Sequence, residues 1–186
     1  SSWGGGVYRS TNGGETWTYV GLHDTRSIGR VVLDPVDPNV AYVAAVGNLW
    51  AANDERGVFK TTDAGKSWRK ALFIDNVTGV TDIMMDPRDA KVLYAATYQR
   101  MRSACCFNGG GPVSAIYKST DAGATWKKLE GGIPAGDKGR IGLAISMSKP
   151  DVLVATIEHT TATGLYRSED AGATWNSVII ANTHAA

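Results

Sequence analysis

The chain has 186 residues, which is enough for one ordinary domain, and its 19 Lys and Arg residues nearly balance 18 Asp and Glu residues. This near-neutral charge argues against a non-specific nucleic-acid or polyanion binder. No apolar run approaches the ~20 residues that a membrane helix needs, so we expect no transmembrane segment in this stretch. The chain starts at Ser1 without a Met, and we interpret it as a processed or excerpted polypeptide.

Taken from the N-terminus, the chain repeats one octet four times. The copies are Ser10–Trp17, Thr61–Trp68, Ser119–Trp126 and Ser168–Trp175. Each follows a short apolar or aromatic run that ends in Arg or Lys, which is typical of a strand. An acidic or amide residue and a glycine then precede the tryptophan, so each octet predicts the turn of a β-hairpin.

Two positions of each octet have an expected structural role. The third residue can accept hydrogen bonds from N–H groups of its own turn, and the leading Ser or Thr can do so more weakly. The final tryptophan is expected to be a large apolar anchor whose indole N–H needs a partner. These positions are Asn12, Trp17, Asp63, Trp68, Asp121, Trp126, Asp170 and Trp175.

The pattern S/T-x-D-x-G-x-S/T-W resembles the Asp-box, or BNR repeat, of β-propellers. The resemblance covers essentially the whole chain and includes sialidases, xyloglucan-type glucanases, sortilin-like ectodomains and photosystem II assembly factors. It implies an all-β propeller of four-stranded antiparallel blades. It also implies that the box is a structural turn away from the active face.

The segments between the boxes fit this expectation. The boxes recur about every fifty residues, which suits a four-stranded blade. Arg30–Val46, Thr81–Thr97 and Arg140–Ile157 each contain two apolar runs joined by a turn, as expected for strands A and B. The boxes then join strands C and D.

One propeller segment, 1–186, is therefore expected to hold about three and a half blades. The expected limits are 1–20 for a half blade with strands C and D only, then 28–75, 80–130 and 139–181. Because repeat units need neighbours on both sides, we expect a part of a larger propeller. The alternative is a small open or partner-completed array of sheets.

Recognition residues are expected on the rim opposite the boxes, where the B–C and D–A connections are irregular. The candidates are Trp50, Asp54, Arg56, Tyr98, Arg100, Arg102, Arg30 and Arg140. Trp50 and Tyr98 could stack a sugar or anchor a protein, or pack over their own loops. Asp54 and Glu55 could serve acid–base chemistry, or be solvated charges.

Arg30 and Arg140 both follow a glycine at the start of strand A and are interpreted as equivalent positions. They could form an anion clamp at the mouth of the channel. The alternative is a repeat-structural arginine that ties neighbouring blades together. The adjacent Cys105 and Cys106 are either two loop thiols or a rarer vicinal disulfide.

No metal site, cofactor site or nucleic-acid interface is predicted, because the three histidines lack ligand spacing and no phosphate-binding loop is present. The catalytic motifs of sialidases and glucanases are not matched. We therefore expect a non-catalytic protein-interaction or scaffold propeller. It would be an extracytoplasmic (periplasmic or secreted) accessory or assembly subunit of a larger complex, which could be membrane-bound. The alternative is a fragment of a glycoside hydrolase or a carbohydrate-binding propeller.

Overall fold

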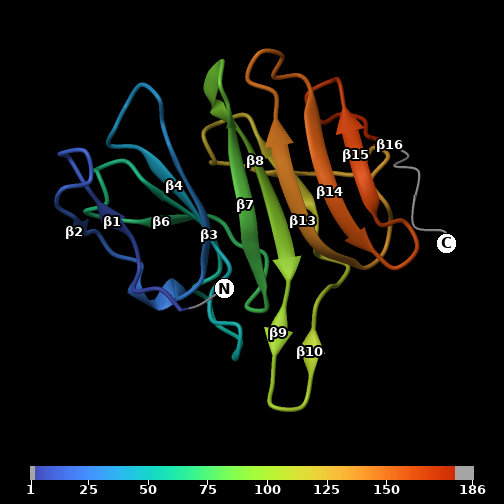
Figure 1. Ribbon diagram of the computed structural model, residues 1–186, viewed down its shortest axis with the longest axis horizontal. Coiled ribbons are helices and arrows are strands. Elements are labelled where there is room, and N and C mark those ends of the chain that lie inside the picture. The colour runs from blue at the N-terminus through green and yellow to red at the C-terminus, as the bar shows by residue number, and fades with distance from the viewer. Residues whose placement is uncertain (1–2, 179–186) are drawn as a thin grey trace.

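The computed structural model describes residues 3–178 and consists almost entirely of antiparallel sheets (Figure 1). Each full sheet is a four-stranded meander in chain order. The first comprises β3 (Ile28–Leu33), β4 (Ala41–Ala45), β5 (Gly57–Thr61) and β6 (Arg69–Leu72). The second comprises β7 (Thr78–Asp86), β8 (Asp89–Gln99), β11 (Ile116–Ser119) and β12 (Lys127–Leu129). The third comprises β13 (Lys138–Ile145), β14 (Leu153–His159), β15 (Gly164–Ser168) and β16 (Asn176–Val178).

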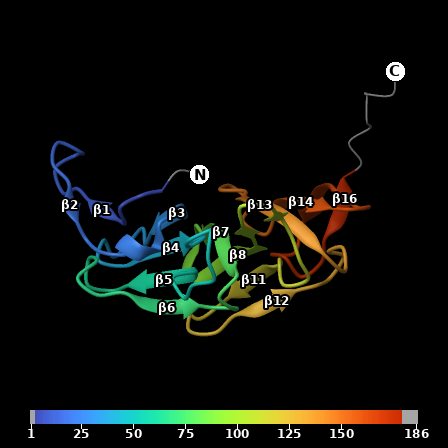
Figure 2. The same ribbon diagram turned by 90° about the horizontal axis from the view of Figure 1, so that it is seen from below.

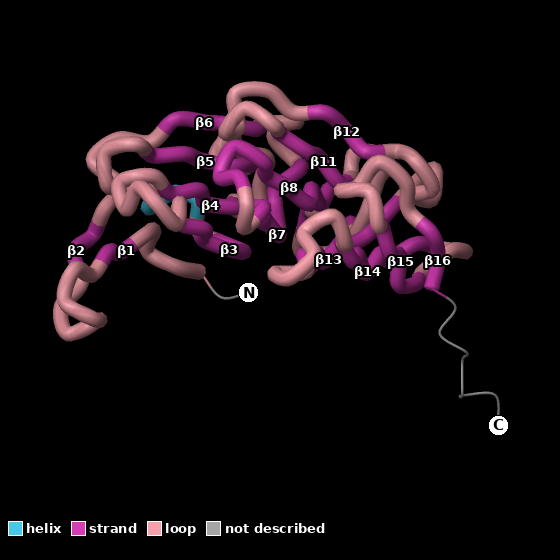
Figure 3. The backbone as a smooth tube through the Cα atoms, turned by 90° about the horizontal axis from the view of Figure 1, so that it is seen from above, coloured by secondary structure: helices cyan, strands magenta, loops and turns pink. Residues whose placement is uncertain are grey.

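A half blade precedes these sheets. It contains only β1 (Tyr8–Arg9) and β2 (Thr18–Tyr19), and a single 3-10 turn, His23–Thr25, leads to β3. Figures 2 and 3 show the four units following one another in an arc, with β1–β2 at one end and β13–β16 at the other. The β-propeller fold class is thus confirmed, as is the number of strands expected in the blades. The expected end of the last blade, at residue 181, lies outside the described residues.

One pair of strands was not predicted. The long B–C connection of the β7–β12 blade contains a separate hairpin formed by β9 (Met101–Arg102) and β10 (Phe107–Asn108). Arg102 lies opposite Phe107 in its register. Figure 1 shows this hairpin projecting beyond the end of its sheet, and we call the segment 100–110 the arm.

The boxes are the tips of the C–D hairpins, as predicted. In the third box, the Ser119 hydroxyl donates to Asp121 at 2.8 Å and accepts the Gly123 N–H at 2.9 Å. Asp121 in turn accepts the N–H and the hydroxyl of Thr125. The boxes of Asp63 and Asp170 repeat these contacts. In the first box the Asn12 carbonyl accepts the Ser10 hydroxyl and the Thr16 N–H, but its amide nitrogen donates to the Thr16 hydroxyl, which reverses that one bond.

In each box the glycine and the residue before it both have a left-handed backbone, and this was not predicted for the preceding residue. The alanine before the box glycine has φ of 64° at Ala64, 57° at Ala122 and 55° at Ala171. Gly13 holds this place in the first box, with φ 70°. The turn therefore requires two consecutive residues with positive φ, of which alanine tolerates the first only at some cost in strain.

The four box tryptophans are not equally buried, contrary to expectation. Trp175 is 3% exposed, Trp68 and Trp126 are half-buried, and Trp17 is 62% exposed. Trp126 packs against the apolar cluster that its own blade shares with the preceding blade, and the Trp68 indole donates to the Val20 carbonyl of the half blade at 2.7 Å. Trp17 has no preceding blade among the described residues, which accounts for its exposure.

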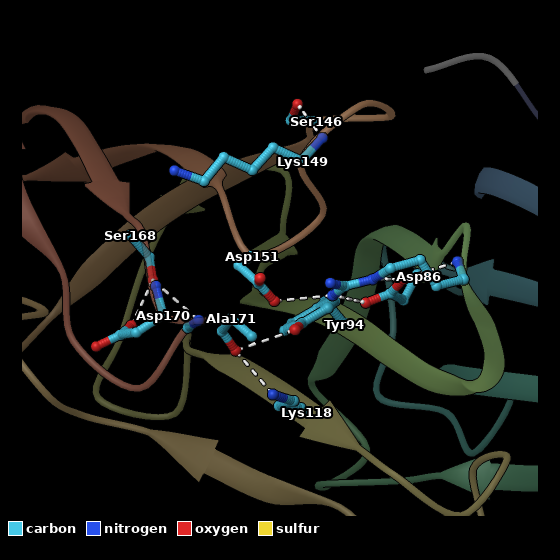
Figure 4. A network of polar contacts seen from close by, with 11 residues as sticks. Asp86, Tyr94, Lys118, Ser146, Lys149, Asp151, Ser168, Asp170 and Ala171 are labelled. Carbon is cyan, nitrogen blue, oxygen red and sulfur yellow. Dashed lines mark hydrogen bonds and ion pairs between the residues drawn. The ribbon is translucent and has the colours of Figure 1, made fainter.

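Successive blades are joined at the box rim by a repeated pair of hydrogen bonds. Tyr94 on strand B and Lys118 on strand C both donate to the Ala171 carbonyl of the next box, at 3.0 and 2.8 Å (Figure 4). Tyr42 and Lys60 donate in the same way to Ala122, at 3.0 and 2.9 Å. Burial raises the pKa of both tyrosines to about 12. We call this pair of contacts the interblade latch.

Because of the box carboxylates, we expect the free energy of unfolding to fall in acid. Hydrogen bonds from the Ser67, Thr125 and Thr174 hydroxyls lower the pKa of Asp63, Asp121 and Asp170 to about 2. Since the pKa is lower when folded than the usual 3.8, this stabilisation is complete above pH ~4 and is lost as the pH falls towards 2.

The first box suggests a matched variant, because there Asn12 takes the place of the aspartate and is hydrogen-bonded to the same two neighbouring positions, Ser10 and Thr16. The triple change of Asp63, Asp121 and Asp170 to Asn should keep the fold and reduce the loss of Tm between pH 4 and 2. Melting followed by circular dichroism at each pH checks this. Equal slopes for the parent and the variant would contradict it.

Candidate functional site

The loop rim lies opposite the boxes and is formed by the B–C and D–A connections. The boxes share their rim with the A–B turns, because Ala64 N–H donates to Asn39 and Ala171 N–H donates to Asp151, both at 2.9 Å. The chain therefore separates a short, repetitive rim from a longer and irregular one. The candidate site lies on the irregular rim.

Arg56 holds three connections of the loop rim together. It is fully buried, and its guanidinium donates to the carbonyls of Asn48 (2.6 Å), Val77 (3.1 Å) and Arg100 (3.2 Å). These acceptors lie on two B–C connections and one D–A connection. Burial lowers the pKa of Arg56, and Asp75 partly offsets this effect. Arg56 was expected to contact a ligand, but its side chain is fully buried and its Nη1 and Nη2 atoms donate to backbone carbonyls.

The arm carries an aromatic side chain close to two cations. Phe107 is 58% exposed, and the guanidinium carbons of Arg100 and Arg102 each lie 5.4 Å from its ring centroid. This distance suits cation–π attraction. Residues 98–114 contain no Asp or Glu, so the arm is positively charged.

Trp50 lies on the neighbouring connection and is attached to the arm. The Arg102 N–H donates to the Leu49 carbonyl at 2.7 Å, which fixes the Trp50 loop beside β9. Trp50 is 52% exposed. The structure thus brings Trp50, Arg100 and Arg102 together with Phe107 in one region of the loop rim.

The other predicted rim residues divide by exposure. Asp54 is exposed beside the half-buried Glu55. Tyr98 is only 5% exposed, and burial raises the pKa of its hydroxyl. Tyr98 packs beneath Arg100, 5.6 Å from its guanidinium, so it supports the arm instead of presenting a contact surface.

Arg30 and Arg140 are not equivalent, contrary to the sequence interpretation. Arg30 lies opposite Ala44 in strand B, and the residue at that register in the last blade is Gly142, opposite Thr156. Arg140 lies two residues before Gly142, so the shared Gly-Arg string occurs at different registers in β3 and β13. The two arginines do not form a clamp at one register.

Arg30 instead ties blades together. Its Nε lies 2.9 Å from Asp82 on β7, and the other Asp82 oxygen accepts the Leu143 N–H of β13 at 2.9 Å. One carboxylate therefore joins the A strands of three blades. Arg140 is exposed, and its N–H donates to Glu158 at 3.0 Å.

The tip of the arm contains the two cysteines. Cys105 and Cys106 form a vicinal disulfide, the rarer of the two alternatives considered from the sequence. The Ser103 hydroxyl accepts the Cys106 N–H at 3.1 Å and closes the turn. The arm thus presents the disulfide, Phe107 and Arg102 in a short exposed span.

Phe107 was not selected from the sequence as a binding residue. Its string, CCFNGGG, lacks the alternation of a strand, so neither β10 nor the placement of the ring beside Arg102 could be inferred. Only the composition of this connection indicated a binding residue, since it combines an aromatic residue with two arginines and contains no acidic residue.

Comparisons with known proteins agree with this architecture. The family described as Sortilin-Vps10 (sortilin, neurotensin receptor 3) matches residues 5–137. The chain belongs to this family. It spans 15% of the Xyloglucanase Xgh74A of Acetivibrio thermocellus, to which it is 32% identical over 141 residues, or 68% of this chain. A Paenibacillus xyloglucanase is 30% identical over 150 residues, covering 68% of this chain and 13% of its own length.

Solved structures show the same fold. The GH74 xyloglucanase of Xanthomonas campestris superposes with a TM-score of 0.70 at 19% identity, over 95% of this chain and 27% of that one. YCF48 of Cyanidioschyzon merolae gives a TM-score of 0.51 at 17% identity, over 86% and 39%. Within residues 3–178, no helix is long and apolar enough to cross a bilayer.

Proposed function

We propose that this chain is the non-catalytic, protein-binding part of an extracytoplasmic propeller and that its loop rim contacts the partner. The observation that carries the proposal is Phe107, which is exposed on a projecting arm within 5.4 Å of the guanidiniums of Arg100 and Arg102. Aromatic residues and arginine are the side chains that protein interfaces enrich and that contribute most to binding. The role would suit an accessory or assembly subunit of a larger complex.

The arm also suggests the chemistry of the partner. Its two guanidiniums have no carboxylate within residues 98–114, so an acidic surface or segment would complement them. Trp50 extends the apolar part of the surface beyond Phe107. We therefore expect a partner that offers a carboxylate near an apolar side chain.

Location outside the cytoplasm is part of the same proposal. Disulfides persist in oxidising compartments and are rare in the cytosol, and Cys105–Cys106 lies at an exposed tip. Membership of the sortilin family supports the same location.

A glycan is the second candidate ligand, since three curated relatives are named as xyloglucanases. Trp50 and Phe107 are both exposed and could stack on a sugar ring. Asp54 and Glu55 would be the nearest acids on the Trp50 loop for hydrolysis. This second hypothesis predicts that the chain binds or hydrolyses xyloglucan oligosaccharides.

The test compares two triple variants. Trp50, Arg102 and Phe107 are changed to Ala on the loop rim, while Val36, Lys66 and Met147 are changed to Ala among exposed residues of the box rim. The chain is used to capture protein from the extracytoplasmic fraction of its source, and the captured protein is purified and titrated. A xyloglucan oligosaccharide panel is run in parallel.

We expect the loop-rim variant to bind the purified partner at least about 30-fold more weakly, as for an interface hot spot, and the box-rim variant to bind as the parent does. Equal affinity for all three proteins would refute the proposal. Xyloglucan turnover that is lost when Asp54 and Glu55 are changed to Asn and Gln would establish the second candidate instead.

A further inference from the structure

The half blade leaves an apolar groove on the side of the first full sheet. The groove has a volume of about 730 Å³, and its walls come from β1, the first two boxes, β3 and the turn that follows β3. They include Val7, Tyr8, Trp17, Val31, Leu33 and Trp68. Four of these side chains are conspicuously exposed: Tyr8 at 51%, Trp17 at 62%, Val31 at 46% and Leu33 at 62%.

The same strand position is buried in the other blades. Val31 lies opposite Val43, and the residues at this register are Ile83, opposite Ala95, and Leu143, opposite Ala155. Ile83 is 0% exposed and Leu143 is 7% exposed, against 46% for Val31. The difference therefore lies in what covers the strand, not in its own sequence.

The covering element can be identified from the later blades. Ile83 packs in a cluster with Tyr42 and Ala44 of β4, which is strand B of the preceding blade. Leu143 packs in the same way with Tyr94 and Ala96 of β8. Since the half blade has only strands C and D in the described part of the chain, Val31 has no strand B to cover it.

The interblade latch shows the same gap. Ala64 holds the box position of Ala122 and Ala171, whose carbonyls accept a strand-B tyrosine and a strand-C lysine. Arg9 holds the strand-C place before the first box. No side chain among residues 3–178 donates to the Ala64 carbonyl, so the strand-B hydroxyl is the component that is lacking.

We infer that this groove is a socket for a two-stranded antiparallel β-hairpin that completes the half blade. Its second strand pairs with the free edge of β1 and places a tyrosine hydroxyl on the Ala64 carbonyl, while apolar residues of the same strand cover Val31 and Leu33. Binding of this kind adds strands to an exposed edge through main-chain hydrogen bonds, and side-chain pockets give the specificity.

The required occupant resembles the A–B pairs of this chain. The pairs in Arg30–Val46 and Thr81–Thr97 both carry the latch tyrosine, at Tyr42 and Tyr94. The third pair has Val154 at that register and so lacks the hydroxyl. A second copy of the chain fits poorly, because each A–B pair within residues 3–178 already belongs to a complete sheet.

The probe is a synthetic peptide with the sequence of residues 79–99, titrated into the full chain by calorimetry. Two matched peptides are compared: one with Tyr94→Phe, and one with the sequence of residues 138–159, which has Val154 instead. The chain variant Val31→Asp places a charge in the socket at an exposed position, and its melting curve verifies its fold.

We expect the 79–99 peptide to bind, the Tyr94→Phe peptide to bind about 2–10-fold more weakly for the loss of one hydrogen bond, and Val31→Asp to abolish binding. Peptide binding that Val31→Asp does not change would overturn the inference. So would dimerisation of the parent chain that Val31→Asp disrupts, because the occupant would then be a second copy.

Because an isolated hairpin is marginally stable, a fused form gives an independent measurement. Residues 79–99 are duplicated ahead of Ser1 through a Gly/Ser linker. The fusion should raise Tm by at least about 2–4 °C, and Val31→Asp in the fusion should remove the gain. No rise in Tm in the fusion, together with no binding of the peptide, would also refute the socket.

Discussion

Replacing Trp175 by alanine should lower the free energy of unfolding by about 3–5 kcal/mol, the usual cost of removing a buried large aromatic side chain. Trp175 is 3% exposed and packs in the cluster that contains Ile141, Leu143 and Tyr166. Its indole N–H also donates to the Gly172 carbonyl at 3.1 Å. Unfolding in urea, followed by circular dichroism, measures the change.

Trp17→Ala is the matched control at the same box position. Its indole makes the equivalent bond to Gly14, at 3.0 Å, but the ring is 62% exposed. We expect a change below about 1 kcal/mol, as for surface positions. Similar losses for both variants would show that the box tryptophan acts mainly within its own turn and not through the adjacent blade.

Arg56→Ala should cost about 3 kcal/mol and loosen the whole loop rim. The change removes charge-assisted hydrogen bonds to the carbonyls of Asn48, Val77 and Arg100 and leaves these acceptors in a buried space. Amide exchange should accelerate in residues 47–53 and 98–104. It should remain slow in β13–β15, which Arg56 does not contact.

Two further variants separate the role of Arg56 from its charge. Arg56→Lys keeps the charge but lacks the planar fork that reaches three carbonyls, so we expect most of the loss to persist. Arg102→Ala removes an exposed guanidinium of the same rim and should change stability by less than about 0.5 kcal/mol. A neutral effect of Arg56→Ala on both stability and exchange would contradict the structural role assigned here.

The fold was predictable because its signals are local and repeated. Each box needs only the turn chemistry of its own octet, and the spacing of the boxes follows from the length of a four-stranded blade. Asp121 and Ser119 therefore make the expected contacts whatever the loops do. The box alanines were missed because a positive φ at Ala122 is set by the turn, not by the residue type.

The rim was less predictable because its residues are defined by contacts between loops. Burial of Arg56 depends on three connections meeting, and none of them specifies this in its own sequence. The comparison of Arg30 with Arg140 was wrong because the Gly-Arg string lies two residues earlier in the last blade, and only strand pairing reveals that Arg30 corresponds to Gly142. Tyr98 and Phe107 are both aromatic residues of one connection, yet one is 5% and the other 58% exposed.

The division between a structural box rim and a recognising loop rim is best tested by amide hydrogen exchange on the chain, with and without a saturating amount of the purified partner. We expect protection in residues 47–53 and 100–110, with the boxes 61–68 and 119–126 unchanged. Protection of the boxes, with an unchanged arm, would contradict the account.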